Sequence, residues 1–236
     1  MLVLGCGVFQ RLLLWPAIVL FPSRRDAWVS HYMRWTAARV FDLIGLAGAR
    51  FEFDTSVPSS EPTLVVMNHQ SLLDIPAAIL MCEPFYPLFV TRRRYGRYIP
   101  LVSPLLRILR APLIDPERNP KGAIADLGQA TRQLEHAMLI FPEGRRTDDG
   151  EIGHFHPGGL RAIIRERRVP VYLIITDGFW RCRTFVDLAK SLRLVRGRGV
   201  ALGPFQPPAD ESEFSSFIAG LRERMVRELH KLREAA

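Results

Sequence analysis

The sequence predicts an α/β fold in which a mostly parallel central sheet is flanked by helices. Short apolar segments of strand length recur along the chain, and segments with helical periodicity lie between them. The beginning of the chain is apolar and holds three of the four tryptophans, a residue type that favours membrane interfaces. We therefore expect residues 1–48 to form an N-terminal helical hairpin that associates with a membrane, and residues 49–236 to form one α/β domain.

The first segment, residues 2–21, is apolar except for Gln10 and Arg11 at its centre. A helix that spans a bilayer needs about 20 apolar residues, and a central Arg costs roughly 2.5–3.5 kcal/mol on insertion scales. We therefore expect this segment to lie in or dip into one leaflet, on the cytoplasmic face of the plasma (inner) membrane. Arg24 and Arg25 follow directly and suit the headgroup layer.

A second helix is predicted over residues 27–47. Its apolar residues fall largely on one broad face, which either touches the membrane or packs as part of a helical hairpin on the domain itself. These residues are Trp28, Tyr32, Trp35, Val40, Leu43 and Ile44.

The rest of the chain alternates between strands and helices, the order that produces a mostly parallel sheet. Asn119 and Pro120 begin one helix as its N-cap and first residue. Asp210 and Glu213 frame the last helix, which is amphipathic. Strands are expected at 51–53, 63–67, 86–90, 137–141, 169–176 and 199–203, and helices from 71, within 99–109, from 119, over 160–168 and from 210.

Residues 63–82 combine a buried strand, a short turn and a helix. Ser71 is expected to begin the helix through a capping box with Asp74, which leaves His69 in the turn. Inside one helix His69 and Asp74 would diverge by roughly 140°. With His69 in the turn, its imidazole can fold back onto the Asp74 carboxylate, and its other nitrogen faces a substrate. Such a pair makes a hydroxyl nucleophilic at neutral pH. Alternatively, Asp74 only caps the helix and His69 is an ordinary loop residue.

A second polar cluster follows the apolar strand at 137–141 and reads Pro142-Glu143-Gly144-Arg145-Arg146-Thr147. Glycine lets backbone N–H groups approach a ligand closely, and Arg guanidinium groups match pairs of phosphate oxygens. Loops beyond strand ends are where open α/β sheets bind ligands. A solvated charged turn is the alternative. Residues 91–98, dense in Arg and Tyr, likewise form either a membrane-facing or phosphate-facing patch or an exposed short helix.

The net charge is +8, and only three of the 32 basic residues are Lys. An Arg-dominated surface suits an anionic partner. The sequence contains no zinc-finger, RNA-recognition or helix-turn-helix pattern, so we expect membrane lipid and phosphate as partners rather than nucleic acid. The three scattered cysteines suggest neither a disulfide framework nor a metal site. We also expect no metal at His154 and His156, because only His136 lies within reach in the sequence.

The ordered pair of motifs N-H-x-x-x-x-D at 68–74 and F-P-E-G-x-R-T at 141–147 resembles the glycerophospholipid acyltransferase family, of the 1-acylglycerol-3-phosphate acyltransferase type. The resemblance covers about residues 50–205. Two blocks depart from the family pattern. In 110–118, Arg110 replaces a Gly and Pro116 replaces an Arg, for which Arg118 is the candidate substitute; in 169–174, Leu173 replaces a Pro. Residues 155–159 resemble the family's F-x-x-G segment.

The resemblance implies an enzyme that moves a fatty acyl group from acyl-CoA or acyl carrier protein to the free hydroxyl of a lysophospholipid. Its expected acceptor is 1-acylglycerol-3-phosphate, which gives phosphatidic acid, and no cofactor or metal is expected. His69 and Asp74 are the implied catalytic pair, and direct transfer is expected because no Cys or elbow Ser is placed as a nucleophile. The implied substrate-binding residues are Asn68, Arg118, Glu143, Gly144, Arg145, Arg146 and Thr147.

Other acceptors stay open, namely glycerol-3-phosphate, a lyso-ornithine lipid or another lysophospholipid. A non-catalytic lipid-binding protein of the same fold is the competing class. The His69–Asp74 pair argues against it, since a protein that only binds lipid has no need of a base.

Overall fold

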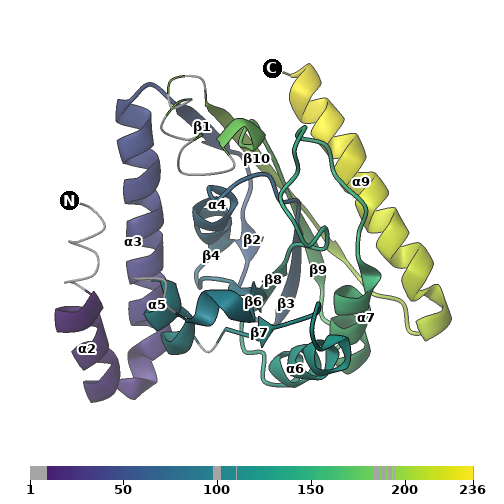
Figure 1. Ribbon diagram of the computed structural model, residues 1–236, viewed down its shortest axis with the longest axis horizontal. Helices are drawn as coiled ribbons and strands as arrows, with labels where there is room; N and C mark the ends of the chain where they lie inside the picture. The colour runs from purple at the N-terminus through teal and green to yellow at the C-terminus, as the bar shows by residue number, and fades with distance from the viewer. Residues whose placement is uncertain are drawn as a thin grey trace.

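The computed structural model of the chain describes residues 10–97, 102–109, 111–182, 187, 190, 193 and 195–235. At its centre lies a six-stranded sheet with the strand order β1-β10-β9-β3-β8-β5 (Figure 1). β10 and β9 run antiparallel, and the other neighbouring pairs of this sheet run parallel, as predicted. The strands are β1 (Arg50–Phe53), β3 (Thr63–Met67), β5 (Leu88–Phe89), β8 (Ala137–Ile140), β9 (Val171–Asp177) and β10 (Arg196–Phe205).

Helices cover both faces of the sheet, because successive side chains of a strand point to opposite faces. In β3, Val65 and Met67 pack with α3 and α4, whereas Leu64 and Val66 pack with α6, α7 and α9. Each position of β3 is buried, which suits the four apolar residues that follow Thr63 in this strand. The helices are α2 (Trp15–Leu20), α3 (Arg25–Leu46), α4 (Asp74–Met81), α5 (Val102–Ile108), α6 (Pro120–Arg132), α7 (Pro157–Glu166) and α9 (Phe214–Glu234).

Two small sheets lie outside the central one. β2 (Val57–Pro58) pairs with β4 (Cys82–Glu83), and β6 (Thr91–Arg92) pairs with β7 (Leu113–Ile114). The second pair brings the Arg-rich segment beside the 110–118 block, a proximity that the sequence did not predict.

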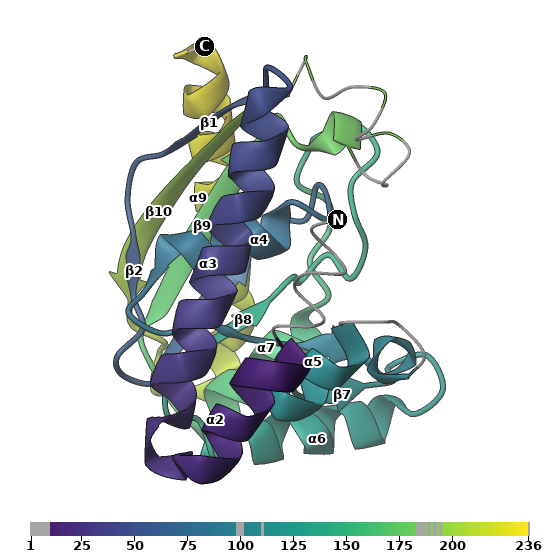
Figure 2. The ribbon, with the colours of Figure 1, turned by 90° about the vertical axis from the view of Figure 1, so that its left-hand side faces the viewer.

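The expected helical pair at the beginning of the chain is present as α2 and α3. Figure 2 shows α3 running along one face of the sheet, with α2 beside its first turns. A π-helical turn over Gln10–Leu14 leads into α2. Residues 2–9 of the expected leaflet segment lie outside the described residues. Within the described ranges, no helix is both long and apolar enough to cross a membrane.

The apolar residues of the second helix do not all lie on one face, so that part of the prediction is wrong. Tyr32 and Ile44 are buried as a face against the domain requires, but Trp28, Trp35 and Leu43 are exposed. The helix carries apolar residues on two sides, and the side that packs on the sheet is completed by Val29, Met33, Ala37 and Phe41.

Several element boundaries also differ from the predicted ones. The helix expected from Ser71 begins at Asp74. The strand expected over 86–90 is only Leu88–Phe89, and the one expected over 199–203 extends over Arg196–Phe205. α7 begins at Pro157, because Pro suits the first turn of a helix, where its missing N–H costs nothing. The division of the chain at residue 48 stays a prediction.

Candidate active site

The carboxyl ends of β3 and β8 bring the two predicted motifs together. These strands are parallel, with Val66 beside Ile140, so the turn after β3 and the loop after β8 leave the sheet at the same edge. The His69 ring of the first motif stacks on the Phe141 ring of the second, with the ring centroids 4.1 Å apart.

At this edge the His69 imidazole contacts the Asp74 carboxylate. His69 Nδ1 lies 2.8 Å from Asp74 Oδ2. The Asp74 side chain is fully buried, whereas that of His69 is 19% exposed. An ionised carboxylate can only accept, so Nδ1 carries the hydrogen and the lone pair of the neutral ring lies on Nε2. The predicted contact between the imidazole and the carboxylate is present, and the His69 side chain is partly exposed.

Asp74 is held by more than its histidine. Its Oδ2 also accepts the backbone N–H groups of Gln70, at 2.6 Å, and Ser71, at 2.7 Å. The turn therefore wraps around the carboxylate, which explains why the helix begins at Asp74. The predicted capping box is half formed, because the Ser71 hydroxyl accepts from the N–H of Leu73 instead of Asp74.

Glu143 joins the two motifs. Its Oε1 accepts the backbone N–H of His69 at 2.9 Å, and its Oε2 accepts that of Gly153 at 2.8 Å. The backbone carbonyl of His69 in turn accepts from the N–H of Thr147 at 2.8 Å. The second motif therefore fixes both backbone groups of the catalytic candidate. Burial raises the pKa of the Glu143 carboxyl above its ordinary value, and the two N–H donors oppose this shift.

The loop after β8 turns sharply at Gly144, whose φ of 68° lies in the left-handed region that favours glycine. Its carbonyl accepts from Arg92 Nη2 at 2.7 Å, and Arg92 also pairs with Glu117. Arg92 therefore connects the loop of the second motif to the segment that holds Arg118.

The predicted phosphate-binding arginines lie on these two connected loops. Arg118 and Arg145 are exposed, and Arg146 is half-buried. Thr147 is also half-buried, and its hydroxyl donates to Asp149 Oδ1 at 2.7 Å. Guanidinium groups of this kind can donate charge-assisted hydrogen bonds to an anionic group. Arg110, the other departure from the family pattern, lies outside the described residues.

Comparison with known proteins decides the family. A family model described as Acyltransferase matches residues 49–176, which is more than half of the chain. The chain belongs to the acyltransferase family. Among solved structures, the 1-acyl-sn-glycerophosphate (LPA) acyltransferase PlsC of Thermotoga maritima has a similar fold, with a TM-score of 0.72 at 20% identity over 98% of this chain and 95% of that one.

Two curated relatives of this acyltransferase have different named acceptors. The 1-acyl-sn-glycerol-3-phosphate acyltransferase of Limnanthes alba is 27% identical over 148 residues, which are 61% of this chain and 52% of the relative. The lyso-ornithine lipid O-acyltransferase of Rhodobacter capsulatus is 29% identical over 170 residues, 64% of this chain and 59% of the relative. The chain thus spans little more than half the length of these relatives.

Asn68, expected to bind substrate, is buried and faces the sheet in this acyltransferase. Its amide donates to the carbonyl of Thr176 at 2.8 Å and accepts the N–H of Thr176 at 2.9 Å. Both polar atoms of the side chain thereby attach the turn after β3 to β9. Its role in the structure is to position the turn.

Two residues that hold this site together, Gln70 and Arg92, are absent from the predicted site residues. The buried Gln70 donates to the carbonyl of Gly150 and to Asp177 Oδ1, and accepts the N–H of Phe179 at 3.0 Å. Arg92 lies in the Arg-rich segment 91–98, for which a phosphate-facing patch is one of the predicted alternatives. Its pairing with a distant loop gives no signal in sequence.

His154 and His156 are exposed, with ring centroids 6.0 Å apart. They belong to no cluster of three metal-ligating side chains in the part of the chain that the structure describes.

Proposed function

We propose that this acyltransferase transfers a fatty acyl group from the thioester of acyl-CoA or acyl carrier protein to the free hydroxyl of a lysophospholipid. The proposed acceptor is 1-acylglycerol-3-phosphate, and the product is phosphatidic acid. The observation that carries the proposal is the 2.8 Å contact between His69 Nδ1 and Asp74 Oδ2, beside a loop rich in arginine.

In the proposed reaction, His69 Nε2 takes the proton of the acceptor hydroxyl while its oxygen attacks the thioester carbonyl carbon. Asp74 orients the ring and stabilises the imidazolium that forms. The tetrahedral intermediate then collapses, the carbon–sulfur bond breaks, and the leaving thiolate receives the proton from His69. An ester and a free thiol result.

Direct transfer is favoured over an acyl-enzyme by the state of the possible nucleophiles. Burial raises the pKa of the Cys82 thiol to about 12 and also raises that of Cys182, so both thiols are protonated at neutral pH. The Ser71 hydroxyl donates to the carbonyl of Cys182 and is fully buried.

The acceptor phosphate is proposed to bind Arg146, with Arg145 or Arg118 assisting. Glu143 and Gly144 shape the loop that presents these groups, and Arg92 holds the loop through the Gly144 carbonyl. Arginine suits this task, because its planar guanidinium binds phosphate oxygens in pairs.

A lyso-ornithine lipid is the second candidate acceptor. The lyso-ornithine lipid O-acyltransferase of Rhodobacter capsulatus is 29% identical to this chain, and the 1-acyl-sn-glycerol-3-phosphate acyltransferase of Limnanthes alba is 27% identical. The replacement of the expected Arg by Pro116 also changes the block that the family resemblance associates with phosphate.

The enzyme is proposed to work on the cytoplasmic face of the plasma (inner) membrane, docked through its first two helices. Large apolar side chains gather there in exposed positions, which suits contact with lipid. They are Leu12, Leu13, Trp15, Val19, Leu20, Phe21, Trp28 and Trp35.

The test is thiol release from palmitoyl-CoA with lysophosphatidic acid, for wild type and His69→Ala, with the lipid product identified by mass. We expect a loss in rate of roughly 10²–10⁴-fold in the variant. Unchanged activity in His69→Ala would refute the mechanism. Turnover only with lyso-ornithine lipid would keep the chemistry and replace the acceptor.

A further inference from the structure

A cavity of about 540 Å³ lies at the edge of the sheet opposite the proposed active site. It is bounded by the first turn of α3, by α6 and by residues 134–137, which lead into β8. Ala137 begins β8 and Phe141 follows its end. At about 3.3 Å per residue the cavity is therefore roughly 13 Å from the His69 ring that Phe141 contacts.

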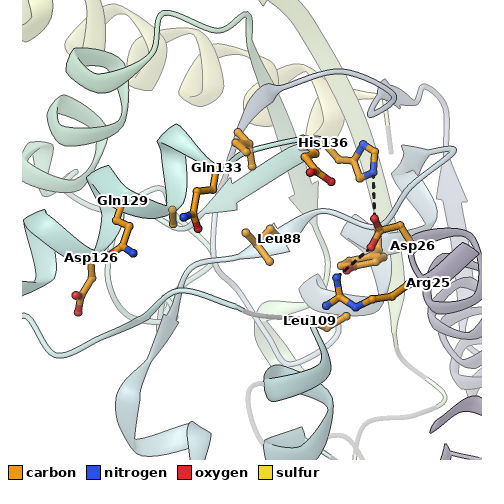
Figure 3. A pocket seen from close by; sticks show the side chains of 13 residues that line it. Arg25, Asp26, Leu88, Leu109, Asp126, Gln129, Gln133 and His136 are labelled. Carbon is orange, nitrogen blue, oxygen red and sulfur yellow. Dashed lines mark ion pairs between the residues drawn. The ribbon is translucent and has the colours of Figure 1, made fainter. Parts of the chain in front are cut away.

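Three side chains at this cavity form a cluster of metal-ligand type. Asp26, Glu135 and His136 offer two carboxylates and one imidazole, with the donor atoms all within 4.8 Å of one another. Figure 3 shows Asp26 and His136 pointing toward each other across the cavity wall. His136 Nε2 lies 3.9 Å from Asp26 Oδ2.

This separation is too long for a hydrogen bond but suits two ligands of one ion. Ligand atoms about 2.1 Å from a zinc ion are about 3.4 Å apart in a tetrahedral site and at most about 4.2 Å apart. Glu135 is exposed, so rotation of its side chain can bring its carboxylate onto the same ion.

The ring of His136 is already oriented for such a role. It stacks on Phe85, with ring centroids 3.9 Å apart and an interplanar angle of 14°. Its Nδ1 is buried and has no hydrogen-bond partner among the described residues. Nε2 is therefore the nitrogen that is available to a ligand, and it is the one that faces Asp26.

Among the described residues, the charged side chains around the cluster do not contact the carboxylate oxygen of Asp26 that faces His136. Arg25 Nη1 lies 3.5 Å from Asp26 Oδ1, the carboxylate oxygen other than the one nearest His136. The second guanidinium nitrogen of Arg25 donates to the carbonyl of Ile108. Asp126, also at the cavity, pairs with Arg93 at 3.1 Å.

We propose that Asp26, Glu135 and His136 bind a divalent transition-metal ion of the zinc class. One imidazole with two carboxylates suits Zn²⁺, whereas Mg²⁺ and Ca²⁺ prefer oxygen ligands throughout. The ion ties the first turn of α3, and with it the helical pair, to the amino end of β8. This proposal differs from the expectation of no metal. The sequence does not predict the site, because Asp26 is far in sequence from Glu135 and His136. It is independent of the proposed acyl transfer.

The test uses full-length protein without an affinity tag, treated with a chelator and titrated with Zn²⁺ by calorimetry. We expect one equivalent to bind to wild type, with affinity at least about tenfold lower in His136→Gln and Asp26→Asn. His154→Gln is the matched control, because it removes an exposed histidine elsewhere and should bind as wild type does. If the other variants fold poorly, Glu135→Gln tests the same site at an exposed position and should also bind Zn²⁺ more weakly than wild type.

Two further readouts locate the ion. Zn²⁺ should raise the melting temperature of wild type and not that of His136→Gln, since binding to the folded state alone stabilises it. The spectrum of bound Co²⁺ should lack the intense thiolate charge-transfer band of a cysteine site. Equal affinity in wild type and His136→Gln, a thiolate band, or no binding at millimolar Zn²⁺ would overturn the proposal.

Discussion

The carboxylate of Glu143 accepts the backbone N–H of His69 at 2.9 Å, so a residue of the second motif positions the histidine of the first. Its other oxygen accepts the N–H of Gly153. Glu143 thus holds three segments in register: the turn after β3, the loop after β8 and the loop that leads to α7. This contact gives a physical reason for the two motifs to occur together.

Glu143→Gln should lower stability and change its pH dependence. The amide keeps one acceptor oxygen, so one of the two N–H groups loses its partner, at a cost of about 1–3 kcal/mol. Burial raises the pKa of Glu143 in the folded state, so folded wild type binds the proton more tightly than unfolded chain does. The unfolding free energy of wild type should therefore exceed that of the variant most at low pH. This difference should shrink as pH rises from about 4.3, the ordinary glutamate pKa, through the raised folded-state pKa.

Urea unfolding of both proteins between pH 4 and pH 7 measures this difference. The change of unfolding free energy with pH in wild type is the reference, because all other groups titrate in the same way in both proteins. If the unfolding free energies of the two proteins differ by the same amount at every pH, Glu143 has no raised pKa.

Asp74→Asn should abolish most activity while leaving the fold. An Asn oxygen can still accept the N–H groups of Gln70 and Ser71, but the neutral amide cannot stabilise an imidazolium at His69. We expect kcat to fall by roughly 10²–10⁴-fold, with a small change in KM. Thiol-release kinetics check this, with circular dichroism as the control for folding. A kcat within a few-fold of wild type would reduce Asp74 to a helix cap.

The His69–Asp74 pair could be predicted because it depends on a strand, a turn and a helix that follow one another. The mostly parallel sheet could be predicted for a similar reason, since alternating elements permit few other arrangements. The start of α4 was misplaced because the side chain of Asp74 takes the N–H groups of Gln70 and Ser71, a competition that helix signals do not reveal.

Contacts between distant segments could not be predicted in this way. The hydrogen bonds of Gln70 to Gly150 and of Arg92 to Gly144 join positions with no shared pattern. The burial of α3 was also ambiguous, because apolar periodicity does not tell a side packed on a sheet from one left exposed. Trp28 and Trp35 share the predicted apolar face with Tyr32 and Ile44, yet they are exposed in the structure.

Arg34 should act as a positioning residue for Asp74. From α3 it reaches the end of α4, where Nη1 donates to the carbonyl of Cys82 at 2.8 Å and to those of Ile79 and Leu80 at 3.2 and 3.3 Å. It thereby caps the eight-residue helix whose first residue is Asp74.

Arg34→Ala should cost about 1–3 kcal/mol in unfolding free energy and lower kcat several-fold without raising the KM of either substrate. Arg34→Lys should restore part of kcat, because it keeps the positive charge at the helix end. Arg39→Ala is the matched control, since Arg39 lies on the same helix and pairs only with Asp42 among the ion pairs described for it. If Arg34→Ala and Arg39→Ala behave alike, the cap has no part in positioning Asp74.

Arg146→Ala should weaken binding of the acceptor and spare the donor. Loss of one charge-assisted hydrogen bond to phosphate, worth about 1.5–3 kcal/mol, should raise the KM for lysophosphatidic acid by about tenfold or more. The KM for palmitoyl-CoA should stay within about twofold. Arg161→Ala is the control, because this exposed residue lies on α7 and donates to Ser215. Equal effects on both substrates would place Arg146 outside the acceptor site.

Charges introduced into α2 should release the enzyme from membranes. Trp15 and Leu20 are exposed apolar residues of this short helix, and a carboxylate there would have to enter the lipid and meet anionic headgroups. In co-sedimentation with vesicles that contain phosphatidylglycerol, the double variant Trp15→Glu/Leu20→Glu should bind at least about tenfold more weakly than wild type. Ile124→Glu changes an exposed apolar residue on α6 and should bind like wild type. If Ile124→Glu weakens vesicle binding as much as the double variant does, the effect comes from net charge and not from contact of α2 with lipid.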